Sequence, residues 1–238
     1  MYLAPIHQAL RSILLQQAEE AFSTKPDLAN VLHGRRRVHP GSRGKRPAYF
    51  PSRINNATMV PESQLEAFYC LLLERDPNVA GYRCQALEIE LSQGQRYFPD
   101  FLIRTWDDRW QVREIKPNRG HLTDEEQARH DLAEKLLSRC GFDFSVIDMT
   151  DLPSPIQLKN LYQLYNRAIA RSWSVQECNL AMEQIGQLPG PQPLQALYDR
   201  LAGAGLSPLI IDYLLFHGRL EANLDLPLQL DLQVGVPK

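Results

Sequence analysis

The sequence lacks the features of membrane proteins, secreted disulfide-rich proteins and zinc proteins. No apolar run approaches the ~20 residues of a membrane span, and no basic leader precedes an apolar run at the start. We therefore expect neither membrane association nor a signal peptide. The four cysteines lie far apart and include no CxxC pair, so we expect reduced, mostly buried thiols in a cytoplasmic protein, with no disulfide and no zinc site.

Common catalytic motifs are also absent. The six histidines show neither HxxxH nor HExxH spacing, so we expect surface or packing residues rather than metal ligands. The sequence has no Gly-rich phosphate-binding loop and no nucleophile elbow. Both absences argue against a P-loop nucleotide hydrolase and against Ser-His-Asp catalysis.

Acidic residues are missing from one long stretch of the chain. None occurs between Leu28 and Pro61, although the whole protein has a net charge of −2. Residues 33–53, here called the basic arm, are either a solvated loop or a phosphate-binding segment, with Tyr49 and Phe50 available to contact bases or sugars. The basic residues of the arm, all candidate DNA contacts, are Arg35, Arg36, Arg37, Arg43, Lys45, Arg46 and Arg53.

The composition divides the chain into three parts. Residues 1–55 contain an amphipathic helix that we expect to end near Pro26, followed by the basic arm. Residues 56–152 mix predicted helices and strands, and residues 153–238 are mostly helical. The apolar side of the first helix must be covered by the rest of the chain or by a partner.

The middle part has the pattern of a compact α/β domain. A helix is predicted over residues 60–77, and its expected buried face consists of Leu65, Phe68, Tyr69, Leu72 and Leu73. Three strands joined by short turns follow as an antiparallel meander, over residues 87–91, 96–106 and 109–117. A Thr123/Glu126 capping box and Gly141 bound a second helix, and residues 142–148 form one more strand.

The last part resembles a winged-helix domain in its order of elements. Four predicted helices precede a final apolar stretch, over residues 156–170, 174–186, 193–205 and 207–218. A helix, a Gly-containing turn, a second helix and a short strand pair are typical of a winged helix. The last of these helices would occupy the recognition position, but its only acidic or basic residues are Asp212 and His217. A helix that reads the major groove normally offers Arg, Lys, Asn or Gln. We therefore expect this domain to dock protein rather than to read DNA.

One carboxylate interrupts the apolar stretch YFPDFLI (residues 97–103). Asp100 follows Pro99, which cannot donate a ladder hydrogen bond and therefore suits an irregular or edge position. Glu114 and Lys116 lie two apart on the next predicted strand, so both point to the same face. If the two strands pair across the short turn between them, the two carboxylates converge at one end of the sheet.

Two close carboxylates repel each other unless a positive charge lies between them. Mg²⁺ meets this condition, and two carboxylates with a backbone carbonyl, here that of Ile115, suffice to hold it. Lys116 would then orient an attacking water or a phosphate oxygen. The combination predicts metal-dependent phosphodiester hydrolysis. The alternative is that these residues are surface turns and a structural Glu–Lys pair.

The preceding helix can supply a third acid. Glu62 and Glu66 are four residues apart and share a face. Glu66 also completes a capping box with Ser63, so a purely structural role is equally open. Since Glu66 borders the expected buried face, it is also placed where it can join Asp100 and Glu114.

Three ordered blocks, SQLEAFYCLLLERDPNV, YFPDFLI and EIKP, resemble the TnsA family over residues 49–149. TnsA proteins are endonuclease subunits of heteromeric transposases with a restriction-endonuclease-like PD-(D/E)xK core. The resemblance implies an α/β fold in which helices flank a mixed sheet, with a C-terminal winged-helix-like domain. It places the family's catalytic residues on Glu66, Asp100, Glu114 and Lys116. The N-terminal helix and the basic arm have no counterpart in it.

The resemblance also implies a function and partners. Such a subunit cleaves the 5′ strand of double-stranded DNA at transposon ends with Mg²⁺, for which Mn²⁺ can substitute. A DDE-type transposase cleaves the 3′ strand, and an AAA+ ATPase regulates the assembly. The implied metal ligands are Glu66, Asp100, Glu114 and the Ile115 carbonyl. The alternatives are a stand-alone restriction or repair nuclease, and a scaffold that binds DNA and partners without cutting.

Reversing the charge of Arg35, Arg36 and Arg37 tests the basic arm. If the arm binds phosphates, the triple Glu variant binds duplex DNA more weakly, by a similar factor for every sequence and with a smaller salt slope. Phosphate contacts carry no sequence information, which explains the uniform loss. Fluorescence anisotropy over a salt series measures both quantities. Unchanged affinity and slope would favour the solvated loop.

Overall fold

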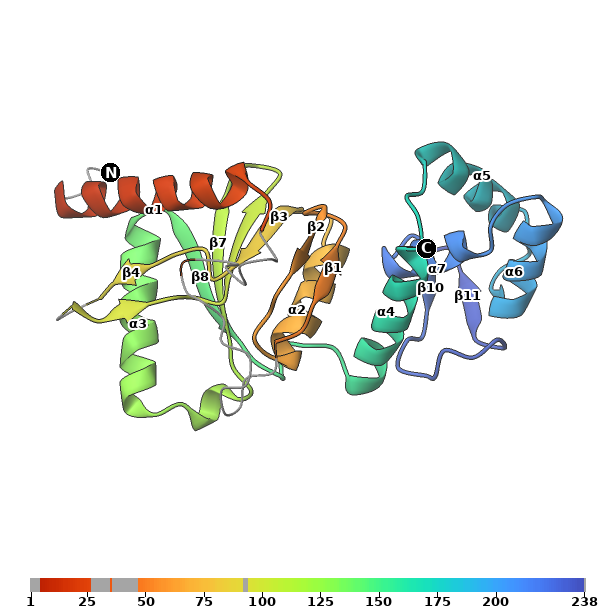
Figure 1. Ribbon diagram of the computed structural model, residues 1–238. Helices are drawn as coiled ribbons and strands as arrows, with labels where there is room; N and C mark the ends of the chain where they lie inside the picture. Colours follow the sequence, from red (N-terminus) through yellow and green to blue (C-terminus); the bar gives the residue numbers. More distant parts are fainter. Residues whose placement is uncertain (1–4, 27–34, 36–46, 92–93, 238) are drawn as a thin grey trace. The chain divides into compact units, whose positions relative to one another are not determined.

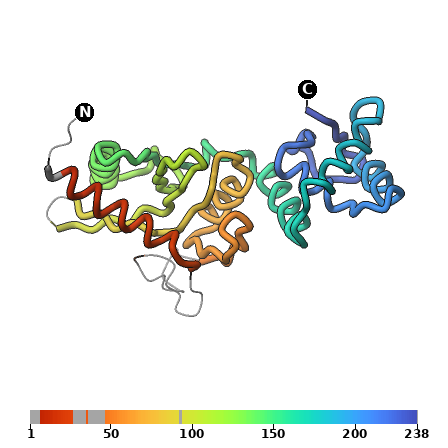
Figure 2. The backbone as a smooth tube through the Cα atoms, turned by 90° about the horizontal axis from the view of Figure 1, so that it is seen from above, coloured from red at the N-terminus to blue at the C-terminus, as the bar shows by residue number. Residues whose placement is uncertain are grey.

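The computed structural model describes residues 5–26, 35, 47–91 and 94–237 of the 238-residue chain. The chain divides into two compact units, Met1–Leu152 and Pro153–Lys238, whose backbones are drawn in Figure 1 and Figure 2. No helix in the described part of the chain could span a lipid bilayer. All four cysteines are free and buried, as predicted.

A four-stranded sheet forms the centre of the first unit (Figure 1). Its strands, in spatial order, are β3 (Val79–Cys84), β6 (Phe101–Thr105), β7 (Trp110–Ile115) and β8 (Phe142–Ile147). β6 is antiparallel to both of its neighbours, whereas β7 and β8 are parallel. The sheet is therefore mixed. Parallel neighbours need a crossover connection, which is provided here by α3 (Asp124–Arg139).

Helices cover both faces of this sheet. Besides α3, the helices α1 (Pro5–Ser23) and α2 (Gln64–Arg75) pack against the sheet. On one face, Leu14 of α1, Leu102 of β6 and Leu137 of α3 belong to one buried cluster. On the other face, Tyr69 of α2 packs edge-on against Phe101, with ring centroids 5.2 Å apart. Successive strand residues point to opposite faces, so α2 lies opposite α1 and α3, and the fold is α/β with a mixed sheet flanked by helices.

The prediction of one continuous three-strand meander is wrong, because its first strand is not part of the central sheet. β4 (Ile89–Glu90) and β5 (Arg96–Tyr97) pair only with each other, in a separate two-stranded sheet. The second expected strand is interrupted at residues 98–100 before it resumes as β6. Pro99 lies in the interruption, where no ladder hydrogen bond is required of it. The pairing of β6 with β7 across the short turn is confirmed.

α1 belongs to the first unit and is covered by it. Leu14 and Ala18 on its apolar side are fully buried against the sheet. The Gln17 side chain donates to the Glu88 carbonyl (3.1 Å) and accepts from the Glu88 N–H (2.8 Å). α1 accordingly lies beside the β4–β5 hairpin in both views (Figure 1, Figure 2). The chain itself therefore buries the apolar side of its first helix.

β3 was missed by the sequence analysis. Its residues are buried on both sides, between the end of α1 and α2, so polar and apolar residues do not alternate along it. Arg83 is buried within it because its guanidinium donates to the Ala21 carbonyl and to the Asn55 side chain, both at 2.8 Å. Because an arginine is usually exposed, its presence at a buried position further hides the strand from an analysis of hydrophobic periodicity.

The end of the basic arm is part of a second unpredicted element. β1 (Phe50–Ser52) and β2 (Ala57–Met59) form an antiparallel hairpin. Phe50 is only 4% exposed, because the hairpin turns its ring into the unit. The expectation that Phe50 contacts bases or sugars is therefore wrong, whereas Tyr49 is 67% exposed.

α2 buries a different face from the one predicted. Leu65, Phe68, Tyr69 and Leu72 are only half-buried. The buried residues are Glu66, Ala67, Cys70, Leu71, Leu73 and Glu74. Of the residues predicted for the buried face, Leu73 is buried. The prediction left Glu74 out of that face, but buried carboxylates are tolerated where they find donors. Glu74, for example, accepts hydrogen bonds from the Tyr82 hydroxyl (2.9 Å), the Arg53 N–H (3.0 Å) and the Ser52 hydroxyl.

The second unit packs helices on a small sheet. The helices lie at the predicted positions, as α4 (Pro155–Ala168), α5 (Val175–Gly186), α6 (Leu194–Gly203) and α7 (Leu209–Phe216). The antiparallel strands, in spatial order, are β10 (Glu221–Ala222), β11 (Gln233–Gly235) and β9 (Gln192–Pro193). β9, which directly precedes α6, was not predicted.

α7 lies in the core of the second unit. Its aliphatic residues are almost all buried, and the Asp212 carboxylate is fully buried. Asp212 accepts a hydrogen bond from the Tyr198 hydroxyl (2.7 Å) and pairs with Arg167 (3.2 Å). The single acid of this helix is therefore engaged inside the unit.

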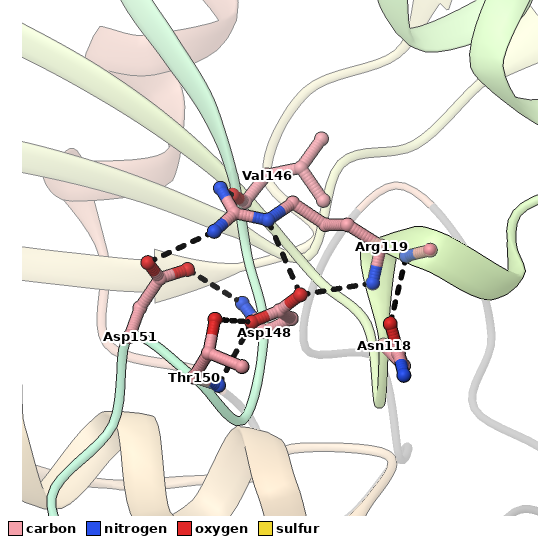
Figure 3. A network of polar contacts seen from close by, with 7 residues as sticks. Asn118, Arg119, Val146, Asp148, Thr150 and Asp151 are labelled. Atoms are coloured by element: carbon pink, nitrogen blue, oxygen red, sulfur yellow. Dashed lines mark hydrogen bonds and ion pairs between the residues drawn. The ribbon is translucent and has the colours of Figure 1, made fainter.

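A polar network joins the segment after β7 to the end of β8 (Figure 3). Asp148 Oδ1 accepts hydrogen bonds from the Thr150 hydroxyl (2.6 Å) and N–H (2.8 Å), and Oδ2 accepts from the Arg119 N–H (2.9 Å) and Nε (3.2 Å). Asp151 binds the same guanidinium (3.0 Å). These bonds, first that from the Thr150 hydroxyl, hold the pKa of Asp148 below its ordinary value. We call Arg119, Asp148, Thr150 and Asp151 the Asp148 network.

Asp148→Asn should lower the free energy of unfolding at neutral pH. Because folding lowers the pKa of Asp148, its charge stabilises the fold above the unfolded-state pKa of about 3.9, and this contribution is lost as the pH falls below that value. The difference between wild type and variant should therefore shrink in acid. Urea unfolding at pH 7 and below about pH 4 measures it, with Asp231→Asn at an exposed aspartate as control. Equal stability of Asp148→Asn and wild type at pH 7 would contradict this role.

Candidate functional site

The structure brings four of the predicted residues together around one cavity in the first unit. Glu66 lies on α2, Asp100 directly precedes β6, Glu114 lies on β7 and Lys116 directly follows it. All four line a cavity of about 410 Å³. Other residues that line it include Glu62, Arg96, Tyr97, Ile115 and Arg129.

Only the Ser63 half of the capping box predicted for Ser63 and Glu66 is found at the start of α2, and the Glu66 side chain binds the N–H of Glu62 instead. The backbone N–H of Glu66 donates to the Ser63 hydroxyl (3.1 Å), and its Oε2 accepts from the Glu62 N–H (2.8 Å). The side chain is 7% exposed. Burial, and the nearby carboxylates of Glu62 and Glu114, raise its pKa. Glu66 thus ties the segment before α2 to the helix and contributes a carboxylate to the cavity, which Glu62 lines as well.

Asp100 connects the interrupted strand to β7. Its Oδ2 accepts a hydrogen bond from the Ile115 N–H (2.7 Å), which uses only one of the two carboxylate oxygens. Burial first, and then the charges of Glu114 and Glu66, raise its pKa well above the ordinary value. A half-buried carboxylate whose charged form is so disfavoured by its surroundings is more typical of a functional site than of a structural position.

Glu114 is held from two sides. It is 5% exposed; its Oε1 lies 2.7 Å from Lys116 Nζ, and its Oε2 accepts from the Tyr97 hydroxyl (2.8 Å). Burial opposes the charged form of Glu114, but His130, Lys116 and Tyr97 outweigh it and lower the pKa. Burial likewise opposes the Lys116 ammonium, but Glu114 and then Asp100 outweigh it and raise the pKa of Lys116. Both members of the pair therefore stay charged at neutral pH.

The backbone around Lys116 is fixed by β8. The Lys116 N–H donates to the Ile147 carbonyl (2.9 Å). Three residues further along, Arg119 is bound by Asp148, which directly follows β8. The Asp148 network (Figure 3) therefore holds the chain on the far side of Lys116 and limits where its side chain can reach.

Sequence reasoning missed Tyr97 and His130. Burial, together with Glu114, raises the pKa of Tyr97, so its hydroxyl stays protonated and can donate. His130 is 2% exposed, and its Nε2 lies 3.8 Å from Glu114 Oε1, too far for a hydrogen bond. Neither ring nitrogen has a hydrogen-bond partner among the described residues. A signal existed for His130, because Ala133 and Leu137, three and seven residues on, mark the buried face of α3.

The basic arm falls only partly within the described residues. Arg35 pairs with Glu20 of α1, and its N–H donates to the Gln85 carbonyl (3.0 Å). Arg53 is exposed, and its backbone N–H donates to Glu74 (3.0 Å). The charge of Arg35 is therefore partly offset by an acid of the same unit. The other predicted DNA contacts lie outside the described residues: Arg36, Arg37, Arg43, Lys45 and Arg46.

The carboxylates fit a metal ion by their chemistry but are bound to protein donors in this arrangement. Across residues 5–26, 35, 47–91 and 94–237, no group of three or more His, Cys, Asp or Glu is arranged to hold a metal ion. Oxygen ligands are nevertheless what Mg²⁺ requires, and Glu66, Asp100, Glu114 and Ile115 all line one cavity. Burial first, and then neighbouring carboxylates, raise the pKa values of Glu66 and Asp100, and a cation bound between the acids would favour their charged forms.

Comparisons of the sequence with protein-family models and with curated proteins found no match. The resemblance to TnsA proteins therefore stays a prediction.

Tyr97→Phe should weaken Mg²⁺ binding. The change removes the hydroxyl that holds Glu114 Oε2 and keeps the ring. Loss of a group that orients a metal ligand typically costs about 10–100-fold in metal affinity, and we expect a loss in this range by isothermal titration calorimetry. Tyr162→Phe, at a tyrosine of the second unit that is 48% exposed, is the matched control. Equal Mg²⁺ affinity of the two variants would show that Tyr97 does not orient Glu114.

Proposed function

We propose that this protein is a Mg²⁺-dependent DNA endonuclease that cleaves the 5′ strand at transposon ends as a subunit of a heteromeric transposase. The observation that carries the proposal is the convergence of Glu66, Asp100 and Glu114 with the charged Lys116 in one cavity. Three oxygen ligands beside one ammonium group are suited to hydrolysis of a phosphodiester.

The residues have distinct parts in the proposed reaction. Asp100, Glu114 and the Ile115 carbonyl, with Glu66, would hold Mg²⁺. When bound, Mg²⁺ polarises the phosphate and lowers the pKa of a water ligand. Lys116 is positioned to orient the attacking water or a phosphate oxygen. The bond from the Ile115 N–H to Asp100 keeps the two strand segments of the site in register.

The fold of the first unit supports the proposal. Two of the acids lie at the ends of adjacent strands: Asp100 at the start of β6 and Glu114 at the end of β7. Lys116 directly follows β7, and α2 brings Glu66 to the same cavity. A mixed sheet flanked by helices, with acids so placed, agrees with the PD-(D/E)xK core that the TnsA resemblance implies.

For the second unit we propose a winged-helix-like fold that docks a partner protein. The order β9, α6, α7, β10 and β11, with the three strands in one sheet, supports this fold. α7 would be its recognition helix, but its only carboxylate is buried against Tyr198 and Arg167. The helix therefore has little to offer base edges, and the DDE-type transposase or the AAA+ ATPase is the proposed partner.

A scaffold that binds DNA without cutting is the weaker alternative. Negative charge repels the phosphate backbone, so acids in the binding surface lower DNA affinity. Burial and repulsion also raise the pKa values of Glu66 and Asp100 and so oppose their charged forms. A scaffold gains nothing from carboxylates held in this way, whereas a metal-dependent hydrolase needs them.

Asp100→Asn separates a catalytic role from a structural one. Asn keeps an oxygen that can accept from the Ile115 N–H, and it removes a charge that burial and two carboxylates oppose. The variant should therefore melt at or above the wild-type temperature, whereas nicking of supercoiled plasmid in Mg²⁺ or Mn²⁺ should fall to background. Glu134→Gln, at an exposed acid of α3, should nick like wild type. Nicking by Asp100→Asn at the wild-type rate would overturn the assignment.

The same assay distinguishes the alternatives. Cutting by the purified protein alone indicates a stand-alone nuclease, and cutting only with a DDE-type transposase indicates a transposase subunit. No cutting under either condition, with DNA still bound, indicates a scaffold. DNA binding by Asp100→Ala should persist in every case, because the loss of an acid does not weaken phosphate contacts.

A further inference from the structure

Arg129 is a cation of the cavity wall that the proposed metal chemistry does not use. It lies on α3 next to His130, and its side chain lines the same cavity as Asp100 and Glu114. Its Nε atom is buried and has no hydrogen-bond partner within the described chain. Buried polar atoms are normally paired, so an unpaired donor at a cavity wall points to a group that enters the cavity.

The other cations of the cavity are neutralised by the protein. Lys116 lies 2.7 Å from Glu114 Oε1, and Arg96 pairs with Glu88 (3.2 Å). Arg129 forms no ion pair with any residue that the structure describes, although acidic side chains line the cavity around it. Its charge acts to lower the pKa of Lys116 and of Tyr97, so the guanidinium lies near both.

The position of Arg129 is held by a rigid element. α3 begins at a capping box formed by Thr123 and Glu126, and its buried face, with Ala133 and Leu137, packs into the core of the first unit. A group on a packed helix keeps its place better than one on a loop. Arg129 is thus presented to the cavity without further ordering of the chain.

We propose that Arg129 binds the phosphate of the DNA strand that is cleaved and stabilises the negative charge that develops on it. A guanidinium can donate two parallel hydrogen bonds to two phosphate oxygens. It acts through charge and hydrogen bonds alone, so it transfers no proton and forms no covalent bond in the reaction. The inference rests on the proposed nuclease function and adds a substrate contact to it.

Substitution of Arg129 with a neutral residue of similar length tests the catalytic effect. Arg129→Gln should lower the single-turnover rate of nicking at saturating DNA about 100-fold, the usual loss for one charge-stabilising donor. Arg129→Lys should recover part of the rate, because Lys supplies the charge without the planar fork. Lys135→Ala removes a cation at an exposed position of the same helix and should nick like wild type.

Two measurements do not depend on cutting. In the non-cutting Asp100→Ala background, Arg129→Gln should reduce the salt slope of duplex DNA binding by about 1, since one phosphate contact is lost. In the wild-type background it should lower neither Mg²⁺ affinity nor melting temperature. A merely structural role would lower the melting temperature and leave the salt slope as it was.

The outcomes separate this inference from the function on which it rests. If wild type nicks, Asp100→Asn does not, and Arg129→Gln nicks at the wild-type rate, the nuclease stands and the role of Arg129 is refuted. If wild type does not nick alone or with its transposase partner, the nuclease proposal fails first. Should Arg129→Gln not fold, the folded Lys variant decides: a reduced rate supports the phosphate contact, and a wild-type rate overturns it.

Discussion

Three carboxylates share one cavity, those of Glu66 and Glu114 buried and that of Asp100 half-buried, although desolvation and mutual repulsion oppose their charged forms. The structure holds each by a different donor: the Glu62 N–H for Glu66, the Ile115 N–H for Asp100, and Lys116 with Tyr97 for Glu114. Most of these donors are backbone groups or neighbours two residues away. The site is therefore built from local geometry at the ends of α2, β6 and β7, which places the acids more firmly than long side chains on loops could.

The outer parts of the unit keep these ends in place. α1 and α3 pack on one face of the sheet and α2 on the other, so the cavity lies between elements that cannot shift independently. At the interruption around Pro99 the chain leaves one sheet and enters another. The Asp100 carbonyl already accepts from the Gln85 N–H (2.8 Å), and its side chain accepts from the Ile115 N–H. On the opposite side of the site, the Asp148 network holds the chain beyond Lys116 to β8.

Local pattern predicted the parts of the site that depend on local geometry. Two-residue periodicity placed Glu114 and Lys116 on one face, and the short turn brought Asp100 next to them. Features that depend on tertiary partners were missed: the buried strand β3, and the contacts of Tyr97 and His130 with Glu114. The buried face of α2 was misjudged for the same reason, since a glutamate with donors can be buried, and apolar periodicity alone does not show the donors.

The pairing of charges in the cavity also bears on its function. If these side chains only stabilised the fold, the cheapest arrangement would pair every cation with a carboxylate, because unpaired buried groups cost free energy. Lys116 is paired in this way, but Arg129 is not, although acids line the same cavity. Among the described residues, the cavity therefore has carboxylates without a cationic partner and also a guanidinium without an acidic one. Such a cavity suits two ligands of opposite charge that bind together. A divalent cation together with a phosphate group is such a pair.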